Sequence, residues 1–158
     1  MKIIGNKEAV ALGIGNFWEG SKQQQEIQTW LDNRHLTEFD SIVYLPTFYT
    51  HLEREIQKLK GNSFYQKDFV GTNDDRIFEI FDLADNDFHK VLCYDITTCS
   101  ASCYFYNNGT EDRIVYSFWD PRHEPQSEIG KVYGLTIDKP YLIEVLSNTL
   151  SELSTDWT

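Results

Sequence analysis

The chain lacks the uninterrupted hydrophobic runs that membrane proteins need. No segment of its 158 residues approaches the roughly 20 consecutive apolar residues of a transmembrane helix. Near the N-terminus, Lys7 and Glu8 interrupt the apolar residues before a run of signal-peptide length can form. We therefore expect a soluble, cytoplasmic protein that has no membrane partner.

Motifs of the common enzyme classes are also missing. The sequence contains no G-x-x-x-x-G-K-[ST] phosphate loop, no G-x-S-x-G nucleophile elbow and no H-E-x-x-H zinc motif. The segment Gly13-Ile14-Gly15 lacks the third glycine and the following helix that a dinucleotide site requires. These absences make an enzymatic function less expected but do not exclude it. We predict no catalytic residues and no cofactor.

Cysteine is scarce, and its odd count of 3 argues against a disulfide framework. His89, Cys93, Cys99 and Cys103 have the spacing H-x3-C-x5-C-x3-C, which invites comparison with a zinc site. On an extended strand, however, Cys99 and Cys103 would lie about 13 Å apart, too far to share one ion. We predict no metal site and interpret the thiols as small core residues.

Basic residues are outnumbered, with 14 Lys and Arg against 25 Asp and Glu, for a net charge of −11. Residues 1–79 carry a net −3 (9 basic, 12 acidic), whereas residues 80–158 carry −8 (5 basic, 13 acidic). An acidic field repels nucleic acid and anionic membranes and attracts basic partners. An acidic surface that only keeps the protein soluble is the alternative.

What the chain does contain is a series of short aromatic and β-branched runs between polar turns. The runs 76–82, 89–96, 100–106 and 113–119 are typical of an antiparallel meander. Asn107-Asn108-Gly109 supplies residues that tolerate positive φ, so it predicts a hairpin between the last two runs. Further strands are expected at residues 9–14, 23–31, 35–37 and 131–137.

Two segments have helical periodicity. Pro46 opens the first, and an apolar face with four-, four- and three-residue spacing follows it: Phe48, Leu52, Ile56 and Leu59. Asp138 and Pro140 begin the second, which carries a stripe of Leu142, Val145, Leu146, Thr149, Leu150 and Leu153. The pattern predicts one α+β domain over residues 1–158, with a single antiparallel sheet of about six to eight strands and two amphipathic helices packed on it.

This layout resembles the immunity proteins of bacterial polymorphic-toxin and contact-dependent inhibition systems. The resemblance rests on the small acidic chain, the strand pair around residues 27–36, the run Val43-Tyr44-Leu45-Pro46-Thr47-Phe48 that opens a helix, and the closing helix after Asp138. It implies a non-enzymatic inhibitor that binds a cognate toxin domain, often a basic nuclease, and covers its active site.

The candidate partner-binding residues are acidic turn residues and one tryptophan. They are Asp82, Asp85, Asp87, Glu111, Asp112, Trp119, Asp120 and Glu124. Acidic side chains would steer a basic toxin, and tryptophan is a frequent interface anchor. Each acidic cluster has a local alternative, because aspartate in turns bonds to nearby backbone. Two other functions stay open, a small enzyme of unrecognised family and an acidic mimic of nucleic acid that inhibits a DNA-binding protein.

Overall fold

The computed structural model describes residues 1–84, 87–94 and 98–158, and its architecture is α+β, as predicted. The strands form two antiparallel sheets, so the prediction of a single sheet is wrong. The first sheet consists of β1 (Lys2–Asn6), β2 (Val10–Phe17), β3 (Gln24–Leu31), β4 (Arg34–His35) and β5 (Ile42–Tyr44). The second consists of β6 (Ala101–Asn107), β7 (Asp112–Phe118) and β8 (Val132–Thr136). The helices are α1 (Leu45–Gly61), α2 (Asp74–Leu83) and α3 (Lys139–Glu152).

In the first sheet, β1, β2 and β3 pair in sequence order, and both β4 and β5 pair with β3. Asp32 and Asn33 form the turn that joins β3 to β4. Asp32 and Asn33 have φ of 53° and 62°, values in the left-handed region that Asp and Asn tolerate better than most residues. The strand predicted at residues 35–37 corresponds to the two-residue β4, which begins one residue earlier, at Arg34, and directly follows this turn.

The second sheet contains the predicted hairpin. β6 and β7 pair from Ala101↔Phe118 to Asn107↔Asp112, and Gly109 in the connecting turn has a φ of 94°. Alternate residues point to opposite faces, as strand geometry requires. Cys103 and Phe105 join the main core, whereas Tyr104 joins a second core on the other face. Because both faces are covered, the strands read as nearly continuous apolar runs.

Helices α1 and α3 confirm the two helical segments predicted from periodicity. The apolar faces that we identified are buried in the main core, with Phe48, Leu52, Ile56 and Leu59 from α1 and Leu142, Val145, Leu146 and Thr149 from α3. Asp138 occupies the N-cap position of α3, but its side chain makes no capping hydrogen bond. The backbone N–H of Lys139 instead donates to Asp112 Oδ2 at 2.8 Å.

The run 76–82, predicted to be a strand, lies in α2. Asn73 caps this helix, since its side chain accepts a hydrogen bond from Arg76 N at 2.9 Å. Asp74 and Asp75 occupy the first turn, where negative charge suits the helix dipole. Ile77 and Phe81 are four residues apart and bury the same face against β6 and β7. The short apolar pattern of residues 76–82 fits the period of a strand as well as that of a helix, and the Asn73 cap favours the helix.

The run 89–96 was also predicted to be a strand. Its described part, residues 89–94, contains one isolated bridge between Lys90 and Tyr104 and no strand. Residues 95 and 96 lie outside the described residues. Leu92 has a φ of 63°, which an extended strand does not allow. The predicted four-stranded meander therefore reduces to the β6–β7 hairpin, extended by β8.

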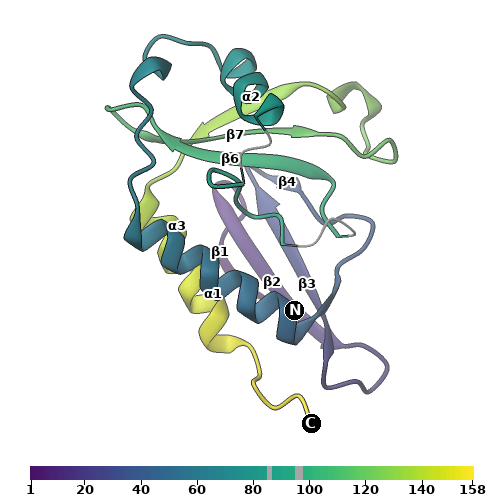
Figure 1. Ribbon diagram of the computed structural model, residues 1–158. Helices are drawn as coiled ribbons and strands as arrows, with labels where there is room; N and C mark the ends of the chain where they lie inside the picture. The colour runs from purple at the N-terminus through teal and green to yellow at the C-terminus, as the bar shows by residue number, and fades with distance from the viewer. Residues whose placement is uncertain (85–86, 95–97) are drawn as a thin grey trace.

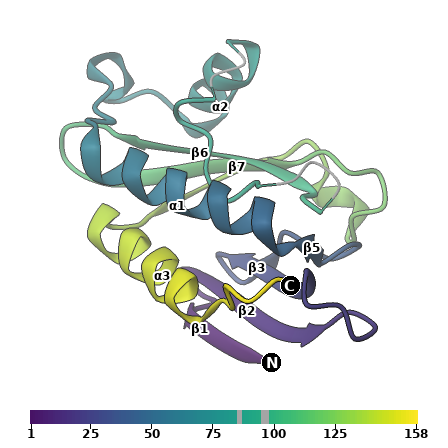
Figure 2. The same cartoon turned by 60° about the horizontal axis from the view of Figure 1, so that its bottom comes forward.

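The molecule is layered (Figure 1). The second sheet lies in the middle, with α2 on its outer face, while α1, α3 and the first sheet lie on its inner side (Figure 2). Within the described residues, no helix is both long enough and apolar enough to cross a membrane.

Candidate functional site

Most of the predicted partner-binding residues that the structure describes fall at two ends of the β6–β7 pair. Asp82, at the C-terminal end of α2, and Trp119, directly after β7, line one cavity of about 290 Å³. Glu111 and Asp112 lie at the other end, in the hairpin turn and at the start of β7. Since β7 has 7 residues, the two groups are separated by about 20 Å along the strand. The described acids therefore do not form one continuous row.

The cavity at Asp82 and Trp119 combines apolar walls with a carboxylate. Phe78, Phe118 and Ile129 contribute apolar surface. Asp82 Oδ1 accepts a hydrogen bond from the Tyr104 hydroxyl at 3.1 Å, which fixes the carboxylate at the end of α2. Trp119 remains 45% exposed, and Leu83 beside Asp82 is 76% exposed. An exposed aromatic side chain next to a fixed negative charge is a suitable binding surface for a basic partner.

Asp120 and Glu124 lie in the loop that follows Trp119. Asp120 is buried and forms a two-point contact with Arg122, with Nε at 3.0 Å from Oδ1 and Nη2 at 2.7 Å from Oδ2. These hydrogen bonds from Arg122 lower the pKa of the Asp120 carboxyl. Glu124 is exposed and lines a second cavity together with His123 and Arg34. Of the two acids, Glu124 is the one open to solvent.

Glu111 and Asp112 differ in the same way at the hairpin. Asp112 accepts hydrogen bonds from Asn107 Nδ2 and from the Lys139 backbone N–H, both at 2.8 Å, so it ties the hairpin to α3. Glu111 is exposed and lies 3.5 Å from Arg113 Nη1. Asp85 lies outside the described residues, and Asp87 lines a cavity beside α1.

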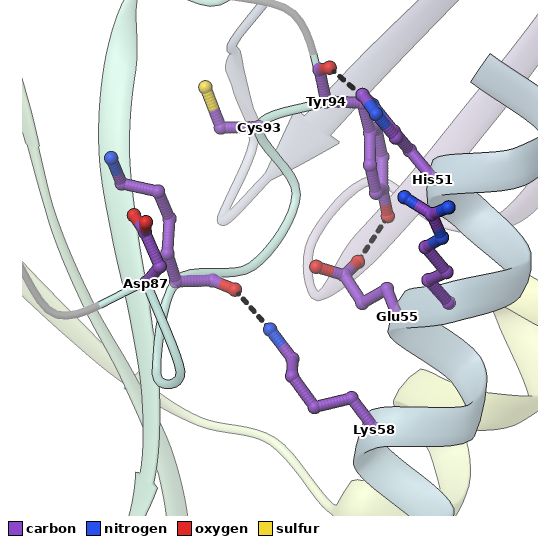
Figure 3. A pocket seen from close by; sticks show the side chains of 8 residues that line it. His51, Glu55, Lys58, Asp87, Cys93 and Tyr94 are labelled. Atoms are coloured by element: carbon purple, nitrogen blue, oxygen red, sulfur yellow. Dashed lines mark hydrogen bonds between the residues drawn. The ribbon is translucent and has the colours of Figure 1, made fainter. Parts of the chain in front are cut away.

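This α1 pocket, of about 500 Å³, was not identified from the sequence. Its residues are His51, Arg54, Glu55 and Lys58 from α1, facing Asp87, Lys90, Cys93 and Tyr94. In Figure 3, His51, Glu55 and Lys58 project from the helix toward Asp87, Cys93 and Tyr94 on the opposite wall. The helical spacing i, i+3, i+4, i+7 of the α1 residues places them on one face.

Glu55 is the buried centre of the α1 pocket, with only 7% of its surface exposed. The Tyr94 hydroxyl donates to Glu55 Oε2, and the backbone N–H of Leu92 lies 3.3 and 3.4 Å from the two carboxyl oxygens. Burial raises the pKa of Glu55, and the hydrogen bond from Tyr94 partly offsets the increase. Burial also raises the pKa of Tyr94 well above its ordinary value.

Lys58 forms the other fixed contact of the pocket. Its Nζ donates to the carbonyl of Lys90 at 2.8 Å, which connects α1 to the facing segment. Burial lowers the pKa of Lys58, while Glu55 and Asp87 act in the opposite direction. From the same helix, His51 places its Nδ1 2.9 Å from the Tyr94 carbonyl of the facing wall, so this nitrogen is the hydrogen-bond donor. Positively and negatively charged side chains therefore line the same cavity.

Of the three cysteines, one lines the α1 pocket. Cys99 and Cys103 are buried, as expected for core residues, and Cys93 is half-buried in the wall of the pocket. A hydrogen bond with Cys93, together with burial, raises the pKa of the Cys99 thiol well above its ordinary value. Within the described residues, no group of three or more His, Cys, Asp or Glu side chains could hold a metal ion.

A third polar cluster surrounds His123. The ring is buried and stacks on Phe118 with centroids 3.7 Å apart. Its Nδ1 contacts Glu38 and its Nε2 lies 2.9 Å from Glu128 Oε1. Burial disfavours the charged ring, but the hydrogen bonds to Glu38 and Glu128 prevail and raise the pKa of His123. Glu128 Oε2 also receives Arg34 Nε at 2.9 Å. The residues of this cluster are up to 94 positions apart in the sequence, so the sequence alone did not reveal it.

Comparisons with known proteins place the fold. No protein-family profile matches the chain, and no curated protein sequence matches it. Among solved structures, it is similar to CdiI from Burkholderia dolosa AUO158, a contact-dependent inhibition immunity protein, with a TM-score of 0.69. The match covers 96% of this chain and 99% of that chain at 11% sequence identity. The resemblance to contact-dependent inhibition immunity proteins that the sequence suggested is therefore confirmed at the level of the fold.

Proposed function

We propose that this protein is an immunity protein that binds and neutralises a cognate bacterial toxin domain without chemistry of its own. The observation that carries the proposal is the similarity to CdiI over nearly the whole length of both chains. Fold alone does not determine function. The proposal therefore also rests on the acidic charge and on the exposed Asp82–Trp119 surface, and it places the protein in the cytoplasm.

The partner is a basic toxin domain, in our proposal a nuclease. The net charge of −11 favours a partner of opposite sign and speeds the encounter of the two proteins. Nuclease domains bind a polyanion and therefore carry basic surfaces. An acidic inhibitor that covers such a surface also excludes the nucleic acid, so no direct interaction between this protein and nucleic acid is needed.

The recognition surface is the end of the second sheet where α2 and β7 terminate. Asp82 and Trp119 share a cavity there, and Glu124 is exposed in the loop that follows. In this arrangement Trp119 is the apolar anchor and the carboxylates orient the basic partner. Asp120 supports the surface by holding the 120–124 loop through Arg122. Asp112 lies at the opposite end of β7, where it ties the hairpin to α3.

The decisive experiment uses the product of the adjacent reading frame. The toxin domain of that product is expressed with and without this protein. When both are expressed, we test whether they co-purify at low salt. We expect a stable complex and a cell that survives toxin expression only when this protein is present. The absence of a complex at low salt would overturn the proposal.

A small enzyme is a second candidate, and the α1 pocket is the observation that favours it. This pocket brings together polar groups with shifted pKa values, which is a common property of active sites. Titration of toxin activity separates the candidates. A binding inhibitor abolishes activity only at an equimolar ratio, whereas an enzyme that modifies the toxin inactivates an excess of it over time.

A further inference from the structure

The α1 pocket differs in charge from the rest of this acidic protein. Three cationic side chains, Arg54, Lys58 and Lys90, line one cavity, against the two carboxyl groups of Glu55 and Asp87. Elsewhere, most of the arginines and several lysines contact carboxylates directly, as Lys2, Lys22, Arg34, Arg76, Arg113 and Arg122 do. Among the described residues, no carboxylate lies within ion-pair distance of the three pocket cations.

The donors of these cations are incompletely used. Lys58 Nζ carries three N–H donors, and the structure uses one of them in the contact with the Lys90 carbonyl. For the Arg54 guanidinium and the Lys90 ammonium, we find no hydrogen-bond acceptor among residues 1–84, 87–94 and 98–158. Arg54 and Lys58 are four residues apart on the same face of α1, and Lys90 faces them. The cations thus approach one cavity from two walls.

The carboxyl groups of the pocket are already engaged or peripheral. Glu55 is buried and receives hydrogen bonds from the Tyr94 hydroxyl and the Leu92 backbone N–H. Asp87 is exposed to solvent. The contact between Lys58 and the Lys90 carbonyl keeps the two walls together without consuming a negative charge. The free donors of the pocket are therefore predominantly cationic.

We propose that the α1 pocket is a binding site for a small anion that bears a phosphate or a carboxylate group. The cavity of about 500 Å³ has room for a molecule larger than inorganic phosphate. Arg54 would bind the anion through paired N–H donors, and Lys58 and Lys90 would add point charges. This site is separate from the Asp82–Trp119 surface and does not depend on the identity of the toxin.

The test is an NMR titration of the whole protein with inorganic phosphate and, in a second arm, with citrate. Sodium chloride keeps the ionic strength constant, so that general screening does not change. We expect saturable shifts of the backbone amides at residues 51–58 and 87–94, with a Kd of about 1 mM or lower. The anion that binds with the lower Kd shows whether the site prefers a phosphate or a carboxylate group.

Matched variants make the result specific. Arg54→Gln and Lys90→Gln should each weaken binding about tenfold, since each removes one charged contact. Lys60→Gln changes an exposed lysine of α1 that does not line the pocket, so its affinity should equal that of the original protein. Shifts that stay linear for both anions, or equal affinities for all three variants, would overturn the proposal.

Discussion

The α1 pocket and the His123 cluster differ in whether their charged side chains form ion pairs within the protein. In the His123 cluster the charged groups are paired with one another, since Glu38 and Glu128 flank the ring and Arg34 forms an ion pair with Glu128. In the α1 pocket, no described carboxylate lies within ion-pair distance of Arg54, Lys58 or Lys90. Both cavities are similar in volume, at about 460 and 500 Å³. The difference indicates that the first cluster holds the fold together, while the second is available to a ligand.

The largest effect should follow from breaking the paired cluster. Arg34→Ala removes the contacts to Glu128, to Asp32 and to the Tyr116 hydroxyl, and leaves partly buried carboxylates without their cation. We expect a loss of about 3 kcal/mol in the free energy of unfolding, measured by denaturant titration. Arg54→Ala in the α1 pocket is the control, and its loss should stay below about 0.5 kcal/mol. Equal losses would contradict the distinction between the two clusters.

The next effect concerns the surface that the paired cluster supports. Trp119 precedes the loop that carries His123, so an ordered loop keeps its ring in position. We expect Trp119→Ala to weaken toxin binding by about 2 kcal/mol, or roughly thirtyfold, when measured by calorimetry. Trp18→Ala is a matched control, because Trp18 is 47% exposed but lies outside this surface. If Trp18→Ala weakened binding as much as Trp119→Ala, the proposed surface would be wrong.

A smaller effect should follow from one hydroxyl in the α1 pocket. Tyr94→Phe removes the donor to Glu55 and leaves a buried carboxyl oxygen with a weaker contact to Leu92 N. We expect a loss of about 1.5 kcal/mol in the free energy of unfolding, as for other unsatisfied buried groups. Tyr44→Phe changes an exposed ring for which the described structure shows no hydrogen bond through the hydroxyl, and should be neutral. Neutral behaviour of both variants would show that Glu55 does not need this donor.

Sequence reasoning was most successful where the information is local. The spacing of apolar residues identified α1 and α3, and Asn107-Asn108-Gly109 identified the β6–β7 turn. It failed at residues 76–82, where a short apolar run fits both a strand and a helix and the Asn73 cap was not weighed. The cap and the spacing of Ile77 and Phe81 were the signal that could have found α2.

The two polar clusters could not be predicted in the same way. Glu55 meets Tyr94 across 39 residues, and His123 meets Glu38 across 85. Such pairs depend on how the two sheets and α1 pack, and no periodicity records that packing. The helical spacing of His51, Glu55 and Lys58 places them on one face of α1. Nothing in the sequence shows which segment faces them.

The smallest effects are pH dependences, which distinguish the clusters by their windows. For both Glu55 and His123 the folded-state pKa lies above the ordinary value, of 4.5 for Glu55 and 6.5 for His123. Above the ordinary pKa, the folded state therefore binds more protons than the unfolded state, and stability falls as the pH rises through the folded-state pKa. The Glu55 contribution begins to fall near pH 4.5, and the His123 contribution near pH 6.5.

Stability measured against pH should separate these windows. The pKa of Glu128 is lowered, so its own contribution is lost only below its ordinary value of 4.5 and does not overlap with either window. We expect Glu55→Gln to remove the decline that starts near pH 4.5, and His123→Gln to remove the one that starts near pH 6.5. Each slope is at most about 1.4 kcal/mol per pH unit for one proton. A His123→Gln profile that still declines above pH 6.5 like the original would show that Glu38 and Glu128 do not hold a proton on the ring, and the paired cluster would lose its electrostatic basis.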